Sequence, residues 1–447
     1  MDKEQILELI GSGAADMGEL RVGLSGMNTA DIADIIKELD NEKVIGTFRI
    51  LPKAIASDVF SHMDSIDQQT IIETLSDAEV GDIVDRLFVD DAVDLLEEMP
   101  ANVVARVLQN VHYEKRKIIN QFLQYPEDSA GSIMTTEYVA LPEDATVQEA
   151  FATIRSGGVN KETIYTCYVV RNDRFLAGVI TARKLMLAGP DQRIGDLMEA
   201  NVVFAGTTDD QEAVAVQFRK YDLLAMPVVD KDRMLVGIIT VDDIVDVIIE
   251  ENTEDIEKMA ALSPSDAPYL DTGVFKLAKN RFLWLLVLML SAVLTGAAIT
   301  SFEHGLAAMP ILMAFIPMLM DTGGNAGSQT AALIIRGMAV GEICKRDIFR
   351  ILWKEIRVAL LCGLGLGTVN FIRVFLMNGQ NLLLCATITL TLCCTLVIAK
   401  TAGAVLPVVA KRFGIDPAIM AAPLITTIAD VLSLLVYFAI ARTLLGL

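Results

Sequence analysis

The sequence has few of the residues from which most catalytic and transition-metal centres are built. Only three histidines occur in 447 residues, and none of the six cysteines belongs to a CxxC pair. This cysteine usage argues against a disulfide or zinc framework and is typical of a reduced, cytoplasmic compartment. A P-loop and a nucleophile beside a base are also missing, so we do not expect an enzyme.

Basic residues are scarce in the first part of the chain. Residues 1–270 hold 23 Lys and Arg against 50 Asp and Glu, a net charge of −27. Nucleic acid binding needs a basic face, so nucleic acid is excluded as a partner. An acidic surface of this size repels itself unless cations neutralise it, and divalent cations prefer carboxylate oxygens. Residues 271–447 hold 14 basic and 8 acidic residues and are strongly apolar.

An apolar signal region is missing from the first residues, so membrane targeting is expected to depend on later spans. Five spans are predicted, each long enough to cross about 30 Å of hydrocarbon, at residues 282–302, 305–335, 358–377, 382–410 and 419–444. Basic residues gather on one side of these spans. The positive-inside rule therefore places the N-terminal part in the cytoplasm and Leu447 outside, in the cytoplasmic (inner) membrane.

The first 130 residues show short amphipathic patterns with apolar residues at i, i+3 and i+4, which predict an all-α superhelical domain. We expect helices at residues 29–39, 54–63, 67–75, 77–88, 90–99 and 101–110. Asp90, Asp91 and Asp94 fall on one helix turn. From spacing alone, a solvated acidic face is the simpler interpretation of these three.

Residues 131–243 contain two βαββα units, which we assign to residues 131–197 and 198–243. The run GVIT at residues 178–181 recurs as GIIT at residues 237–240. These runs, with MPVVD at 226–230, resemble a tandem pair of CBS domains, an α+β fold. The resemblance implies a sensor of adenosine nucleotides such as ATP, with Asp243 at the ribose position. Lys184 replaces the usual Asp in the first unit, so nucleotide binding at one cleft stays open, as does a purely structural role.

Residues 244–272 are predicted to form an acidic connecting helix and linker between the CBS pair and the pore domain at residues 273–447. Acidic residues recur along one stripe from Asp242 to Glu257. A charge run of this kind is usually a solvated face. Here a switching role is equally compatible with the pattern, because the helix leads directly to the membrane.

Polar residues inside the spans are the main functional signal. Asp321, Asn325 and Gln329 recur every four residues and form one polar stripe, which favours a solute path over a tight helix interface. Asp430 lies at the centre of the fifth span, where an ionised carboxylate costs about 2.5–3.5 kcal/mol. Lys400 is interpreted as the partner of a carboxylate or of carbonyls. The role of Asp321, in the pore or against another helix, stays open.

The cation that this chemistry fits best is Mg²⁺, which keeps several of its waters and needs few direct carboxylates. Over nearly its whole length the chain resembles the MgtE family of magnesium channels. The resemblance is carried by residues 125–135 (YPEDSAGSIMT), 253–256 (TEDI), 322–329 (TGGNAGSQ) and the run from Leu406 through 416–418 (DPA) to Asp430. It implies a homodimer with its pore on the two-fold axis and hydrated Mg²⁺ at Asp430.

The same resemblance implies that a turn at Gly323, Gly324 and Asn325 supplies backbone oxygens to the pore. Ala422 stands where some relatives carry Asn, so only a carbonyl contact is expected there. Cytosolic Mg²⁺ would close the channel by bridging acidic residues. The corresponding positions are Asp58, Asp90, Asp94, Asp210, Glu212, Asp222, Asp243, Asp246, Glu251, Glu254, Asp255 and Asp416. Two alternatives remain: a CBS-regulated transporter of another divalent cation or solute, and a membrane-anchored nucleotide sensor.

Overall fold

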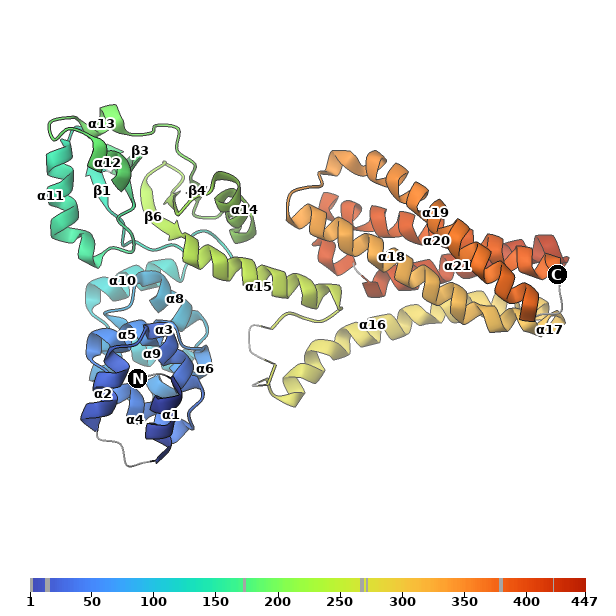
Figure 1. Cartoon of the computed structure of the whole chain (residues 1–447), viewed down its shortest axis with the longest axis horizontal. Helices are drawn as coiled ribbons and strands as arrows, with labels where there is room; N and C mark the ends of the chain where they lie inside the picture. Colours follow the sequence, from blue (N-terminus) through green and yellow to red (C-terminus); the bar gives the residue numbers. More distant parts are fainter. Residues whose placement is uncertain are drawn as a thin grey trace. The chain divides into compact units, whose positions relative to one another are not determined.

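A computed structural model describes residues 3–12, 17–171, 174–265, 269–270, 272–377, 381–420 and 422–447. The chain divides into two compact units, Met1–Val247 and Ile248–Leu447, each of which is described by itself (Figure 1). The coarse prediction of a helical domain, a pair of small α+β units and a helical, apolar C-terminal region is confirmed.

The first unit begins with a succession of short helices, as the amphipathic patterns predict. Asn28 caps the third of them, and Ser76 and Glu79 form a capping box on the seventh. Buried Ile, Leu, Val and Phe side chains join all of them into one core. The helices are α1 (Lys3–Ser12), α2 (Met17–Ser25), α3 (Thr29–Lys37), α4 (Asn41–Ile50), α5 (Lys53–Ser61), α6 (Ser65–Thr74), α7 (Asp77–Val84), α8 (Val89–Glu97), α9 (Ala101–Asn110) and α10 (Tyr113–Phe122).

Two three-stranded sheets follow, and they repeat the same topology. In each, the first strand pairs in parallel with the second, which forms an antiparallel hairpin with the third. The register shifts between Val169 and Val170 in one hairpin and between Val228 and Val229 in the other. The strands are β1 (Ala140–Pro142), β2 (Thr166–Arg171), β3 (Phe175–Thr181), β4 (Ala205–Gly206), β5 (Ala225–Val229) and β6 (Leu235–Thr240).

The helices of this pair are α11 (Val147–Gly157), α12 (Ala182–Leu187), α13 (Ile194–Leu197) and α14 (Gln211–Tyr221). Helix α12 is the last helix of the first predicted βαββα unit, whereas α13 was not predicted, because its four residues are too few to show a helical period. The long helix α15 (Val241–Met259) follows β6 directly, and the division between the two units falls within it, after Val247.

The second unit is built from long helices, and α18, α20 and α21 form its packed centre (Figure 1). The helices are α16 (Val274–Ser301), α17 (Glu303–Ala308), α18 (Ile316–Ala339), α19 (Ile348–Met377), α20 (Leu382–Arg412) and α21 (Ala422–Leu445), with short 3₁₀ turns at Pro310–Phe315, Lys345–Asp347 and Pro417–Met420. Among the described residues, α16, α19, α20 and the segment Pro417–Leu445 are long and apolar enough to cross a membrane.

Two details of the predicted spans are wrong. The second span is not one continuous helix, because α17 and a 3₁₀ turn that begins at Pro310 precede α18. The third helix begins at Ile348 rather than near residue 358, which brings a further acidic residue, Glu355, into the helical bundle.

Candidate functional site

The polar stripe of α18 occupies one exposed face of that helix. Asp321, Asn325 and Gln329 are exposed, whereas Gly323 and Gly324 are buried on the other side. The four-residue spacing therefore has the predicted consequence: the three polar side chains share one face. The alternative of a tight helix interface also holds, but for the opposite face.

The two glycines let α18 pack closely against α20 and α21. A Cβ atom on Gly323 would lie 2.9 Å from Thr395 Cγ2, and one on Gly324 would lie 2.9 Å from Thr426 Cγ2. The turn that the resemblance implied at residues 323–325 is wrong, because α18 runs unbroken through it. A helix satisfies its own backbone polar groups, which is what apolar surroundings require.

Asp430 lies on α21, half-buried, close enough to Asp321 of α18 for the two carboxylates to repel each other. The candidate ion path consists of these two carboxylates and the amides of Asn325 and Gln329. Ala422 begins α21, but its side chain lies outside what the structure describes.

Lys400 has the carboxylate partner that the sequence predicted. Its Nζ lies 3.5 Å from Glu355 Oε2 and donates to Thr330 Oγ1 at 3.2 Å, while the Thr330 hydroxyl donates to Glu355 at 3.0 Å. Both charged side chains are largely buried, which makes this a structural ion pair rather than an ion-handling group. Glu355 was missed because the third span was started too late. Ile348, Ile351 and Leu352, at helical spacing, carried the signal that would have found it.

A cluster of carboxylates lies in the first unit. It joins Asp90 and Asp91 of α8 to Asp242 and Asp243 of α15 and to Glu162, which precedes β2. Asp90 is only 6% exposed, and its Oδ1 and the Oε2 of Glu162 have no hydrogen-bond partner among the described residues. Buried carboxylate oxygens without donors are what a cation would satisfy.

The pKa values in this cluster are shifted upwards. Burial, and then repulsion by Asp243, raises the pKa of Asp90 well above its ordinary value. Burial and the neighbouring acids raise the pKa of Glu162 to about 8. Burial raises the pKa of Asp243 to about 6, even though the Thr240 hydroxyl donates to it at 2.6 Å. These shifts favour the protonated carboxyls, so a cation bound at the cluster would compete with protons.

A lysine and a histidine also lie near the cluster. Burial lowers the pKa of Lys115, although surrounding acids including Glu137 and Asp91 oppose the effect, and its Nζ donates to the Leu87 carbonyl. Burial raises the pKa of Asp91, and the nearby His62 opposes this shift. In the part of the chain that the structure describes, no three acidic, histidine or cysteine groups are close enough to bind one ion directly. A Mg²⁺ ion that keeps its waters and bridges through them fits this looser arrangement.

The other predicted regulatory residues of the first unit are exposed. Asp58 lies on α5, Asp94 on α8 and Asp246 on α15. The carboxyl of Asp246 is only partly covered, and this partial burial, followed by repulsion from Asp242, raises its pKa. Three more belong to α14 and have local roles. Asp210 caps the helix by accepting from Ala213 N at 3.1 Å, Glu212 lies in its first turn, and Asp222 ends it with φ of 50°.

A second group of charges joins the end of α15 to the start of the last span. The ammonium of Lys258 lies 2.5 Å from Glu254 and 2.6 Å from Asp416. Burial alone would lower the pKa of Lys258, but the hydrogen bonds to these two acids raise it. Burial and then Asp416 raise the pKa of Asp255. The expected contact of Asp416 with this helix is present, and Lys258 makes it. Glu251 is half-buried on the same helix.

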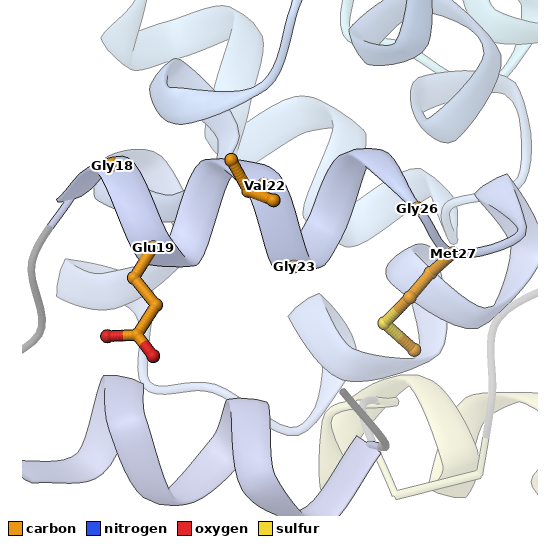
Figure 2. Close-up of a pocket in the computed structure, with 6 residues that line it drawn as sticks. All are labelled: Gly18, Glu19, Val22, Gly23, Gly26 and Met27. Carbon is orange, nitrogen blue, oxygen red and sulfur yellow. The ribbon is translucent and has the colours of Figure 1, made fainter.

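A hollow of about 470 Å³ runs along α2 (Figure 2). Gly18, Val22, Gly23, Gly26 and Met27 line it, with Glu19 as the one titratable group drawn there. A single carboxylate among glycines and apolar side chains does not make an ion site, so we do not connect this hollow with the carboxylate cluster.

Known family models match three parts of the chain. Residues 316–440 match the MgtE family model, described as a divalent cation transporter, and residues 27–128 match the MgtE intracellular N domain. Residues 130–191 and 194–250 match the CBS domain.

Relatives match over the full length. The magnesium transporter MgtE of Thermus thermophilus is 37% identical over 434 residues, which are 96% of each chain. The magnesium transporter MgtE of Bacillus subtilis is 33% identical over 423 residues, 95% of this chain and 93% of that one. A crystal structure of the cytosolic domain of the Mg²⁺ channel MgtE in complex with ATP is 35% identical, with a TM-score of 0.52; it covers 55% of this chain and 100% of that domain.

The raised carboxyl pKa values predict a pH-dependent stability of the first unit. Its folded state binds more protons than the unfolded chain, so this contribution is complete below the ordinary carboxyl pKa and is lost as pH rises through about 6 for Asp243 and about 8 for Glu162. Mg²⁺ competes with these protons. We expect its stabilising effect on the thermal unfolding midpoint to be about 2–4 °C larger at pH 8 than at pH 6.

Differential scanning fluorimetry of the full-length protein measures this effect. Asp90→Asn with Asp243→Asn should remove most of the pH dependence. Asp31→Asn with Asp34→Asn, which neutralises two exposed acids of α3, should leave it. An equal Mg²⁺ effect at both pH values would contradict the assignment.

The Lys400–Glu355 pair predicts a non-additive response to substitution. Lys400→Met should destabilise the second unit by about 3–5 kcal/mol, because Glu355 is left buried without its cation. Lys400→Met combined with Glu355→Leu should recover most of this loss, since neither charge is then buried alone. Thermal unfolding monitored by size exclusion in detergent gives the comparison. The single variant Glu355→Leu completes the comparison. If the loss of stability in the double variant equalled the sum of the losses in the two single variants, the two groups would not be coupled.

Proposed function

The chain belongs to the MgtE family of divalent cation transporters, and from this premise we propose that it carries Mg²⁺ across a membrane along the polar face of α18 beside Asp430. It is a transporter and not an enzyme. The observation that carries the proposal is the exposed stripe of Asp321, Asn325 and Gln329 on a helix that packs among apolar spans.

The proposed membrane topology has five spans, with α18 as the second. Its polar stripe makes α18 less apolar than the four spans identified by composition, but a helix that lines a water-filled path need not be apolar all round. Five spans and the positive-inside rule support a cytoplasmic N-terminal module and an external C-terminus in the cytoplasmic membrane.

The ligand types along the path favour hydrated Mg²⁺. Asp321 and Asp430 supply two carboxylates, and amide and hydroxyl oxygens supply the rest. Ca²⁺ usually recruits more direct oxygen ligands, and transition metals prefer histidine or cysteine. A Mg²⁺ ion that keeps its water shell matches a path with few carboxylates.

A homodimer would close this path. In one chain the polar stripe faces outward, so a second copy related by a two-fold axis would face it with the same stripe. The CBS pair supports the same assembly through equivalent exposed side chains of its two repeats. Tyr165 and Leu224, 69% and 59% exposed, precede β2 and β5, while Met186 and Val245, 72% and 50% exposed, lie on α12 and α15. Apolar side chains exposed at equivalent positions are typical of an interface.

Cytosolic Mg²⁺ would act as the gating ligand. Asp90, Asp243 and Glu162 would hold it in the first unit, and Glu254, Asp255 and Asp416 in the second, while the other acidic positions implied by the resemblance add negative charge. The ion supplies positive charge that lets these acids lose their protons and stay together. Without it they repel one another, so Mg²⁺ favours the conformation in which they are close, which is the closed state.

ATP is proposed as a further ligand of the CBS pair, because the cytosolic domain of a relative was solved in complex with ATP. The second repeat is the better candidate. Its Thr240 and Asp243 lie together, whereas the first repeat has Lys184 at the corresponding position, 3.9 Å from Glu199.

The path predicts that Mg²⁺ flux depends on Asp430. In liposomes with low internal Mg²⁺, Asp430→Asn should lower the flux about tenfold or more, because the midplane carboxylate that stabilises the ion is lost. A Mg²⁺-sensitive dye inside the liposomes measures the rate. Glu303→Gln, which changes an exposed residue of α17, is the matched control and should retain the flux. Equal flux in Asp430→Asn and in the unmodified protein would sink the proposed path.

The gate predicts that neutralised carboxylates leave the channel open. In the same liposomes, Asp246→Ala with Glu254→Ala should raise the internal Mg²⁺ concentration that halves the flux by about tenfold, which corresponds to about 1.4 kcal/mol of lost binding. Neutralising the exposed Asp31 and Asp34 removes the same charge elsewhere and should not change this concentration. Normal closure in the Asp246 and Glu254 variant would reject the carboxylate gate while leaving the path intact.

A further inference from the structure

One face of α19 carries cations and aromatic rings that have no role in the proposed path. Its members lie in the 3₁₀ turn before the helix and in its first turns, and all are exposed: Arg346, Phe349, Arg350, Trp353, Lys354 and Arg357. At about 100° per residue these positions fall within one face of the helix. We call this set the basic stripe.

The opposite face of the same turns is packed inside the second unit. Ile351 and Ala359 are buried, and between them Glu355 pairs with Lys400. The rotation of α19 is therefore set by its own bundle, and the basic stripe has to face away from it.

The stripe continues into a purely apolar surface. Leu360, Leu361 and Leu364, 57%, 72% and 71% exposed, follow Arg357 on the same face of α19. A helix that passes from water through the lipid headgroups into hydrocarbon meets first a polar layer and then an apolar one. Cations and aromatic rings followed by leucines match that order. This continuity indicates that lipid covers the stripe.

The cations of the stripe have few acidic partners. Among the described residues, Asp347 is the acid recorded beside them, 3.8 Å from Arg350, and the side chain of Arg350 is still 90% exposed. The Arg357 guanidinium lies over the Trp353 ring, 5.6 Å from its centroid. Trp353 thus lies at the level where charge and apolar surface meet, which is the headgroup layer for an interfacial tryptophan.

We propose that the basic stripe binds the headgroups of anionic phospholipids on the side of the membrane where the soluble module lies. Phosphate groups are the complementary charge, and the interleaved rings fit the headgroup boundary. A second copy of the same stripe would bring like charges together across a two-fold axis, which disfavours it as the occupant. The proposal requires α19 to span a membrane, but it does not depend on ion flux.

Tryptophan fluorescence tests the proposal, because the chain has only two tryptophans. Trp284→Phe leaves Trp353 as the single reporter. The protein is reconstituted in mixed vesicles of phosphatidylglycerol and phosphatidylcholine, in which either the anionic or the neutral lipid carries brominated chains that quench nearby rings. Each Lys or Arg near an anionic surface adds a factor of about five to lipid preference. We therefore expect the quenching of Trp353 to show that phosphatidylglycerol is enriched around this ring by about fivefold or more, relative to its mole fraction in the vesicles.

Charge variants separate the stripe from a general surface effect. In the Trp284→Phe background, Arg346→Gln, Arg350→Gln and Lys354→Gln together should bring the preference close to one and remove its salt dependence. The matched control is Lys276→Gln, Lys279→Gln and Arg281→Gln, which removes the same charge from an exposed segment of α16 and should retain the preference.

Three outcomes would overturn the proposal. Quenching in proportion to mole fraction in the Trp284→Phe protein would mean a lipid-facing surface without selectivity. No quenching by either lipid would mean that protein, such as the acidic N-terminal module, covers the stripe. A loss of preference in the control equal to that in the stripe variant would mean a diffuse charge effect. The first two outcomes are read without the charge variants, so they stand even where those variants fold poorly.

Discussion

Carboxylates held near one another with too few cations are the interaction on which both units depend. Asp90, Asp243 and Glu162 lie together in the first unit, and buried oxygens of this group have no donor among the described residues. Asp321 and Asp430 repel each other in the second. Glu355 shows the contrast, because Lys400 and Thr330 satisfy it and the site is structural. Where the chain supplies the cation, the group holds the fold together; where it does not, carboxylate oxygens are left without a partner among the described residues.

The charge group at the end of α15 lies between these two cases. Lys258 contacts both Glu254 and Asp416, so one ammonium is shared by two acids while Asp255 lies beside them. A divalent ion that binds there has to compete with a tethered monovalent one. The competition lowers the apparent affinity for the ion without removing the acids, which is useful for a sensor that responds to an abundant ion rather than to a trace metal.

Periodic features of the fold could be predicted from the sequence, and long-range partners could not. The repeat of GVIT and GIIT gave the tandem sheets, and the four-residue spacing gave the exposed stripe of α18. Lys400 demanded a partner on physical grounds, but its identity depended on where α19 begins. Glu162 and the contact between Lys258 and Asp416 were missed because their partners lie far away in the sequence. The pairing of Lys258 with Glu254, four residues earlier on the same helix, could have been predicted from helical spacing. The turn expected at Gly323 was wrong because glycine has two uses, and here close packing against Thr395 requires it.

The first turns of α19 connect two environments through one rigid segment. Glu355 faces Lys400 and Thr330, the latter on the helix that carries the polar stripe, while Lys354 and Trp353 face outward from the same turn. A helical turn does not shear internally at small energies, because its backbone hydrogen bonds fix neighbouring residues together. If this turn moves, the residues on its outer face and those on its inner face therefore move together. The buried ion pair holds that turn against α18, which ties the position of α18 to the surroundings of the outer face.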